Sequence, residues 1–311
     1  MRNIKNTKNI KRFGDNKEKK DRLNSQNHNN FSKIRTSLGG NSQAGSRTQT
    51  NIANQILPNQ IWIYGKHSTF SALQSKRRKI FQILVTKNTE SELEKFIIQN
   101  HLSHLTPLIK SVENVQIESL TGRDQPHQGI AAICSRLPVK SQNDLLEELY
   151  KIKDAAGEDS KAKLPTLLLL DQLSDPQNIG AIIRSAVSFG VKKIIFCEHN
   201  APKENASMCK ASAGTIESVD LVMVTNFNNL IEKLKKISYW CIGLDGTAKT
   251  LISEVKDYNN IALVVGSEGD GIRDLVKKNC DILAKIEINS SVESLNASVA
   301  TSITLYELFK K

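Results

Sequence analysis

Three short stretches of the sequence combine turn-forming residues with side chains that could bind an anion or orient a hydroxyl group. The first is 171–180, in which a turn at Asp175 leads through Asn178 into a helix that carries Arg184. Asparagine is a good helix N-cap, and the backbone at a helix start can bind an anion. An arginine among the isoleucines of this helix is costly without an anionic partner, so a structural ion pair and a substrate phosphate are both open interpretations.

The second stretch is 265–271, VGSEGDG, which follows an apolar run and would begin a helix. Its glycines have the spacing GxxGxG, so the GxGxxG fingerprint of dinucleotide binding is not met, and the chain has no GKS or GKT phosphate-binding loop. Glu268 in such a turn would repel a pyrophosphate and suits a cationic or hydroxyl-bearing ligand better. By itself this turn is a weak signal.

The third stretch is 290–296, immediately before the last predicted helix. Ser294 and Asn296 are first of all capping residues at this position. Taken alone, each of the three stretches therefore has a structural interpretation beside the functional one.

The apolar pattern indicates the elements that would position these stretches. The uninterrupted apolar run 166–170 is typical of a strand covered on both faces, as in a parallel sheet. Beyond it, strands are predicted at 192–197, 219–224, 239–244, 261–265 and 282–288, and helices at 179–189, 230–237, 272–278 and 295–309. On the last helix, the spacing of Leu295, Val299, Ile303 and Tyr306 predicts a buried stripe. The alternation predicts an α/β fold with a mostly parallel sheet, whose ligand would bind outside the carboxyl ends of the strands.

A smaller α/β unit is predicted ahead of this domain, at 59–136. Its expected strands are 61–64 and 80–85, its expected helices 67–76 and 91–99, and the segments 115–120 and 129–134 complete it. The basic cluster 76–79 could hold phosphates or form a solvated face. Residues 137–164 are polar and charged and are expected to link this unit to the domain at 165–311.

The positive charge of the chain is concentrated at one end. Of the 311 residues, 1–58 hold 12 lysines and arginines against three acidic residues, a net charge of +9 out of +11. This stretch is rich in Asn, Ser and Gln and cannot bury enough apolar surface to offset chain entropy, so we expect a disordered basic tail. Such a tail attracts polyanions, RNA foremost, although an inert leader of Asn- and Lys-rich composition explains it equally well. The acidic residues and the missing apolar face argue against a mitochondrial transit peptide.

The composition disfavours several classes of protein. No apolar run approaches the roughly 18 to 20 residues that cross a bilayer, and no secretory leader is visible, so no membrane association is expected. The cysteines form no CxxC pair, and no metal site is expected. They lie in or beside apolar runs and are expected to be buried, reduced thiols of a cytoplasmic protein: Cys134, Cys197, Cys209, Cys241 and Cys280.

In their order and spacing, the three stretches together resemble one family. The segments 175–186 (DPQNIGAIIRSA), 263–272 (LVVGSEGDGI) and 294–301 (SLNASVAT) are similar to the motifs of the SpoU, or TrmH-type, RNA ribose methyltransferases of the SPOUT superfamily. The resemblance covers about 145 residues, from 165 to the end. In addition, 64–67 (YGKH) and 127–131 (HQGIA) resemble the small RNA-binding domain of the subgroup that methylates a guanosine of large-subunit rRNA. One departure is that 286–288 reads IEI where the family often has IPM.

The resemblance implies S-adenosylmethionine as the methyl donor, a carboxy-terminal trefoil knot that forms the cofactor site, and a homodimer through the C-terminal domain. It identifies Gly266, Ile286 and Leu295 as cofactor contacts. Glycine would let the backbone approach the ligand, and the two apolar side chains could flank the adenine.

The resemblance also implies a set of catalytic residues. Arg184 would contact the target hydroxyl or its adjacent phosphate. Because arginine stays protonated, electrostatic positioning is its expected role. The residues that would orient Arg184 and the ribose are Asn178, Glu268, Ser294 and Asn296.

The favoured function is an RNA ribose methyltransferase acting on rRNA, with tRNA as the alternative substrate. The alternative of another class is a non-catalytic RNA-binding or ribosome-assembly protein that has kept the fold, which loss of S-adenosylmethionine binding would favour. A nicotinamide dehydrogenase is disfavoured by the glycine spacing at 266–271.

Overall fold

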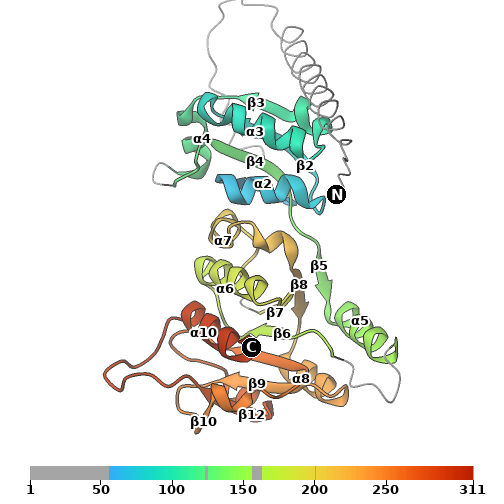
Figure 1. Ribbon diagram of the computed structural model, residues 1–311, viewed down its shortest axis with the longest axis vertical. Coiled ribbons are helices and arrows are strands. Elements are labelled where there is room, and N and C mark those ends of the chain that lie inside the picture. Colours follow the sequence, from blue (N-terminus) through green and yellow to red (C-terminus); the bar gives the residue numbers. More distant parts are fainter. Residues whose placement is uncertain (1–55, 123–124, 156–162, 200, 311) are drawn as a thin grey trace, which may run out of the picture. The chain divides into compact units, whose positions relative to one another are not determined.

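The computed structural model describes residues 56–122, 125–155, 163–199 and 201–310. The predicted tail at 1–58 lies outside the described residues except for its last three positions. The described chain contains a four-stranded sheet and an eight-stranded sheet (Figure 1). Among the described residues, none of the helices combines the length and the apolar character that crossing a bilayer requires.

The smaller sheet has the strand order β1-β4-β2-β3, with β4 antiparallel to both of its neighbours and β3 parallel to β2. Its domain consists of β1 (Gln60–Tyr64), α2 (Lys66–Ser75), β2 (Ile80–Val85), α3 (Lys87–Gln99), the 3₁₀-helix η2 (Ser103–Leu108), β3 (Ile109–Ser111), α4 (Asn114–Thr121) and β4 (Ile130–Ser135). Alternation along β2 places Ile83 in a core with Leu93 of α3, and Leu84 in a second core with Ile117 of α4. Helices therefore cover both faces of this sheet, and its two predicted strands are confirmed.

The larger sheet has eight strands in the order β10-β12-β9-β11-β6-β7-β8-β5, and every strand pair within the described residues is parallel. The strands are β5 (Val139–Ser141), β6 (Leu167–Leu170), β7 (Lys193–Cys197), β8 (Asp220–Val224), β9 (Trp240–Leu244), β10 (Thr250–Leu251), β11 (Ile261–Val265) and β12 (Ile282–Lys285). In β6, Leu168 belongs to one core and Leu169 to the other. The predicted α/β fold with a mostly parallel sheet is confirmed.

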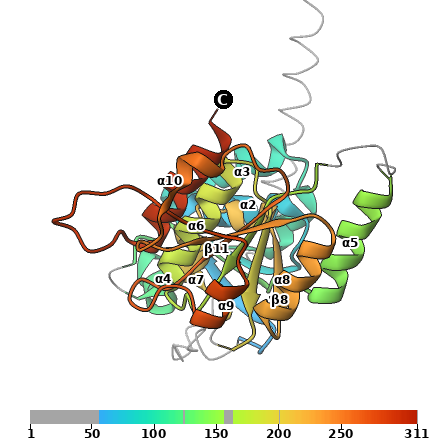
Figure 2. The same cartoon turned by 90° about the horizontal axis from the view of Figure 1, so that it is seen from below.

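Two sets of helices enclose this sheet (Figure 2). One core contains residues of α6 (Pro176–Ser188), α7 (Ala206–Ala211), the 3₁₀-helices η3 (Thr215–Ser218) and η4 (Ile252–Val255), and α10 (Ala297–Phe309). The other contains residues of α5 (Gln142–Ala155), α8 (Phe227–Lys236) and α9 (Asp274–Asn279). From β6 the chain continues to β7 and β8 on one side, and later to β9 and β11 on the other. The strand order therefore reverses between β6 and β11, where open α/β sheets bind ligands at the carboxyl ends.

The segment 137–164, expected to be a polar linker, contains regular structure. Its β5 pairs with β8 at the edge of the larger sheet, and α5 follows directly. Leu145, Leu146 and Leu149 of α5 are buried in the core. Their spacing of one and three residues marks one face of a helix, but the charged residues around them dominate the composition of the segment.

The buried stripe predicted on the last helix is wrong. The buried residues of α10 are Ala297, Thr301, Thr304 and Leu305. By contrast, Val299, Ile303 and Tyr306 are 46%, 36% and 55% exposed. Both sets recur at helical spacing, so periodicity alone does not decide between them. The small side chains allow α10 to approach α6 closely, with the hydroxyls of Ser185 and Ser302 hydrogen-bonded at 2.7 Å.

The basic cluster 76–79 is divided: Arg77 and Arg78 make contacts within the protein, whereas Lys76 and Lys79 are exposed. Arg78 has a fully buried side chain that pairs with Glu204 and, at 2.7 Å, with Glu217. Burial would lower the pKa of Arg78, but the hydrogen bond and charge of Glu204, together with Glu217, reverse this and raise it. Arg77 donates to the carbonyls of Glu217 and Val219, at 2.9 and 2.6 Å. These arginines join the loop after α2 to the loops before β8.

The cysteines follow the expectation of buried thiols in four positions, and Cys280 is half-buried. Burial raises the pKa of Cys134, Cys241 and Cys280 to about 12. These thiols therefore stay protonated near neutral pH and are poor nucleophiles.

Candidate active site

A pocket of about 550 Å³ lies at the carboxyl edge of the larger sheet. It is lined by the loops that follow β9, β11 and β12 and by the beginning of α10. Because the strands are parallel, loops that are far apart in the sequence meet at this edge, where the sequence predicts the ligand. Five of the predicted site residues line the pocket: Gly266, Glu268, Ile286, Ser294 and Leu295.

The loop after β11 closes on itself. The amides of Ser267 and Gly271 each donate to the carbonyl of the other, both at 3.1 Å. A Cβ atom at Gly266 would overlap with the backbone of Gly271 and Ile272. The family resemblance implies that Gly266 lets a ligand approach the backbone. The structure shows that closure of the loop already requires glycine at this position.

Asn178, Glu268 and Asn296, one from each of the three motifs, form a hydrogen-bonded trio. The Asn178 amide donates to Glu268 Oε1 at 2.7 Å, and the Asn296 amide donates to the same oxygen and to Asn178 Oδ1, the latter at 3.0 Å. Asn296 also caps α10, because its Oδ1 accepts the amides of Ser298 and Val299. The carboxylate of Glu268 thus lies at the N-terminus of α10, where the helix dipole favours a negative charge.

The N-cap of α6 is Asp175 and not Asn178. Its carboxylate accepts the amides of Gln177 and Asn178, both at 3.1 Å, and Pro176 occupies the first turn. Proline is well suited to that position because its missing amide has no partner there in any case. The Asn178 side chain is therefore free to reach Glu268.

Arg184 is exposed and makes no polar contact with its side chain among the described residues. The buried face of α6 consists of other residues: Ile179, Gly180, Ile182, Ile183 and Ala186. Of the two open interpretations of Arg184, the structural ion pair is wrong, since helical geometry turns the side chain toward solvent. Of the five predicted catalytic residues, the structure joins three in the trio, places Ser294 in the pocket lining and leaves Arg184 without a partner in the described part of the chain.

An ion pair that the sequence analysis missed connects the end of β6 to the beginning of α9, and its carboxylate is buried. Asp171, fully buried directly after β6, accepts the side chain of Arg273 at 2.7 and 2.9 Å and its backbone amide at 3.0 Å. The hydrogen bond and charge of Asp171 raise the pKa of Arg273. An acidic residue immediately after an apolar strand was the available signal.

A second missed carboxylate, Asp245, lines the pocket after β9. It pairs with Lys277 at 2.7 Å and accepts the amide and hydroxyl of Thr247 at 2.8 and 2.7 Å. Burial alone would raise the pKa of Asp245, but these hydrogen bonds outweigh it and hold the pKa at about 2. Asp245 is therefore ionised at neutral pH.

The lining of the pocket indicates the chemistry of its ligand. Apolar side chains, Ile286 and Leu295 among them, lie beside the carboxylates of Asp245 and Glu268. The hydroxyl of Ser267 is buried and has no hydrogen-bond partner among the described residues, so a polar ligand atom could complete it. Such a site suits a ligand with a flat apolar ring, hydroxyl groups and a positive charge. S-adenosylmethionine has all three, in its adenine, its ribose and its sulfonium.

Comparison with known proteins matches two family models to this chain. The model of the SpoU rRNA Methylase family matches residues 165–306, and the model for RNA 2'-O ribose methyltransferase substrate binding matches residues 62–139. A 23S rRNA (guanosine-2'-O-)-methyltransferase, RlmB, of Coxiella burnetii is 34% identical over 79% of this chain and 94% of its own length. The protein of that name from Xylella fastidiosa is 30% identical over 80% of this chain and 96% of its own.

Solved structures share the fold at lower identity. The SpoU methyltransferase AviRb from Streptomyces viridochromogenes, crystallised with AdoMet, superposes with a TM-score of 0.62 at 19% identity, covering 81% of this chain and 90% of that one. An RNA 2'-O ribose methyltransferase gives a TM-score of 0.61 at 21% identity, over 80% and 88% of the two chains. With both family models matched and relatives aligned over four-fifths of its length, the chain belongs to the SpoU rRNA methylase family.

Proposed function

We propose that this chain transfers the methyl group of S-adenosylmethionine to a ribose 2′-hydroxyl of RNA, and that its substrate is a guanosine of large-subunit (23S-type) rRNA. The observation that carries the proposal is the trio Asn178, Glu268 and Asn296, which unites the three motifs beside the pocket. The rRNA substrate is supported by the names of the relatives that align over almost their whole length. We assign RNA binding to 59–136 and methyl transfer to 165–311, in the cytoplasm.

In this proposal the pocket holds S-adenosylmethionine through Gly266, Ile286 and Leu295. When bound, the cofactor supplies an electrophilic methyl group on a positively charged sulfur. The carboxylates of Asp245 and Glu268 make the pocket favourable for that positive charge. The buried Ser267 hydroxyl offers a further hydrogen bond.

The reaction requires the ribose oxygen to attack the methyl carbon in line with its bond to sulfur, so positioning provides much of the acceleration. Glu268, fixed by two amide groups, can accept a hydrogen bond from the ribose hydroxyl and orient it. Arg184 binds the neighbouring phosphate or the reacting hydroxyl as a fixed positive charge. Its exposure, and the absence of a side-chain partner within the ranges that the structure describes, support this role.

The proposal includes a homodimer formed through the C-terminal domain and a trefoil knot around the cofactor site. The exposed apolar residues Val299, Ile303 and Tyr306 of α10 support the dimer, because association would remove them from water. The knot rests on family membership, and the convergence of the 244–247, 265–272 and 284–295 loops on one pocket is compatible with it.

The proposed function is tested by incubating the protein with S-adenosylmethionine labelled on the methyl group and total RNA from a strain that lacks it. Label in a 2′-O-methylguanosine of the large-subunit rRNA is the expected result. Label confined to tRNA would show that the substrate is tRNA and not rRNA. RNA binding without either label or cofactor binding would identify a non-catalytic member of the family.

A further inference from the structure

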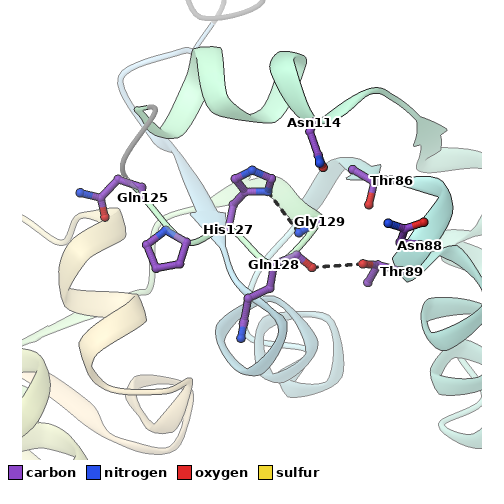
Figure 3. A pocket seen from close by; sticks show the side chains of 9 residues that line it. Thr86, Asn88, Thr89, Asn114, Gln125, His127, Gln128 and Gly129 are labelled. Carbon is purple, nitrogen blue, oxygen red and sulfur yellow. Dashed lines mark hydrogen bonds between the residues drawn. The ribbon is translucent and has the colours of Figure 1, made fainter.

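The small domain carries a second pocket, of about 540 Å³, whose lining includes none of the residues assigned above to methyl transfer. It lies between the end of β2, the beginning of α4 and the loop before β4 (Figure 3). The residues that line it are Thr86, Asn88, Thr89, Asn114, Gln125, Pro126, His127, Gln128 and Gly129. None of these side chains carries a charge when His127 is neutral.

The floor of this pocket is held by hydrogen bonds within the protein. His127 Nδ1 accepts the amide of Gly129 at 3.1 Å, and the Thr89 hydroxyl donates to the carbonyl of Gln128 at 3.1 Å (Figure 3). The Thr86 amide donates to the carbonyl of Gly129 at 2.9 Å. Gly129 has a φ of +74°, and a Cβ atom there would overlap with the hydroxyls of Thr86 and Thr89. A wall fixed in this way loses little freedom when a ligand binds.

His127 is a neutral hydrogen-bond donor in this arrangement. Burial lowers the pKa of His127; the negative charge of Glu118 opposes this effect without reversing it, and the positive charge of Lys210 adds to it. The ring is therefore uncharged at pH 7. Since Nδ1 accepts the Gly129 amide, the single ring proton is on Nε2.

The rim of the pocket offers unused hydrogen-bonding groups. Asn88 and Asn114 are exposed, and their side-chain amides make no hydrogen bond among the described residues. Each amide has an acceptor oxygen and two donor hydrogens. A rim of amides without charges fits the edge of a nucleobase, which presents donors and acceptors side by side, and it is a poor site for a phosphate.

We propose that this pocket receives one unpaired nucleobase of the RNA substrate, with Asn88 and Asn114 bonded to the edge of the base. The proposal rests on the proposed RNA substrate and adds the place of base recognition on the small domain. The base must be unpaired, because only then is its hydrogen-bonding edge accessible. Lys87, exposed between Thr86 and Asn88, provides a positive charge for the adjoining phosphate.

The test measures binding by the full chain without any methyl donor. The probes are the four single-stranded homodecamers of RNA and a decamer of abasic sugar phosphates. The variant is Asn88→Ala with Asn114→Ala. The control is Gln99→Ala, which removes from the same domain an exposed amide that makes no hydrogen bond to any described residue. All are compared by filter binding at several salt concentrations.

We expect the wild type and the control to bind at least one decamer about tenfold more tightly than the abasic chain, as one good base contact provides. The double variant should lose this preference, keep its affinity for the abasic chain and keep the same dependence on salt, because no phosphate contact is removed.

A double variant that still prefers bases by the same factor would overturn the proposal, as would a wild type that does not distinguish the probes. These outcomes are independent of catalysis. If no label is transferred to RNA but the double variant loses its preference for bases, the proposed function is wrong. The nucleobase pocket would still be supported in that case.

Discussion

At the residue scale, the proposed cofactor pocket depends most strictly on glycine at position 266, where a Cβ atom would overlap with the backbone. Gly266→Ala should weaken S-adenosylmethionine binding by roughly tenfold or more, because the added Cβ displaces the backbone of Gly271 and Ile272 and opens the loop. The matched control is Gly269→Ala in the same loop, where a Cβ would meet no atom within 4 Å. Calorimetry should give a wild-type dissociation constant for the control. Equal affinity in both variants would mean that this loop does not hold the cofactor.

Substitution of Arg184 should have the opposite effect: catalysis should be lost and S-adenosylmethionine binding should be retained. Arg184→Ala should reduce methyl transfer by about 10²–10³-fold, the usual effect of removing one preorganised electrostatic contact. Folding and S-adenosylmethionine affinity should not change, since the side chain is exposed and unpartnered among the described residues. Arg184→Lys should recover part of the rate by restoring the charge. A rate for the alanine variant within tenfold of wild type would remove Arg184 from the mechanism.

The sequence predicts which residues belong to the site better than it predicts the contacts and exposure of each one. Asn178, Glu268 and Asn296 were identified from their motifs, and the structure joins them. That Asp175 rather than Asn178 caps α6 was not predictable, because the two residues lie three apart and either can cap a helix. The exposure of Arg184 depends on which side of α6 meets the sheet, which requires the tertiary packing.

At the scale of elements, the buried Arg78 connects the loop after α2 to the loops before β8. Arg78→Met should lower the free energy of unfolding by about 3 kcal/mol or more, because it leaves the buried carboxylates of Glu204 and Glu217 without their cation. Lys76→Met is the control, since Lys76 is exposed and should change stability by less than about 0.5 kcal/mol. Urea denaturation of both variants measures the difference. Equal midpoints would show that these carboxylates are neutralised in another way.

Most of the longer elements were predictable, whereas the short β3 (Ile109–Ser111), β5, α7 and β10 were not, and the two misjudged longer helices have one cause. The strands of the larger sheet are short apolar runs, and such runs are readily recognised. The missed α5 and the reversed α10 are helices whose buried side depends on what packs against them. In α10 the core accepts small threonines and alanines because α6 lies close, so the most hydrophobic stripe is left outside. Hydrophobicity alone favours the other face.

At the scale of the whole molecule, we expect the basic segment ahead of the small domain to increase the affinity for RNA. Deleting residues 1–55 removes a net charge of +9 from a chain of +11. If about a third of those charges contact phosphates, the slope of log K against log salt should fall by roughly two units. Filter binding of both proteins at several salt concentrations measures the slope. An unchanged slope would identify the segment as an inert leader.

The second prediction for the whole molecule concerns the exposed stripe of α10. A surface of Val299, Ile303 and Tyr306 is unfavourable in water, and α10 also begins at the cofactor pocket, with Ala297 and Ala300 in its lining. Association through this stripe would therefore bury apolar area and steady one wall of the site. The same helix would then serve the dimer on one face and the pocket at its beginning.

Replacing Val299 and Ile303 together by Glu should convert the protein from a dimer to a monomer, because two carboxylates cannot be desolvated in an apolar contact without partners. Thermal stability of the subunit should change little, since both side chains are exposed. Val115→Glu, at a 71% exposed valine of α4, is the control and should remain dimeric. Sedimentation velocity distinguishes the states. A wild type that sediments as a monomer, or a double variant that sediments with it as a dimer, would exclude this stripe as the interface.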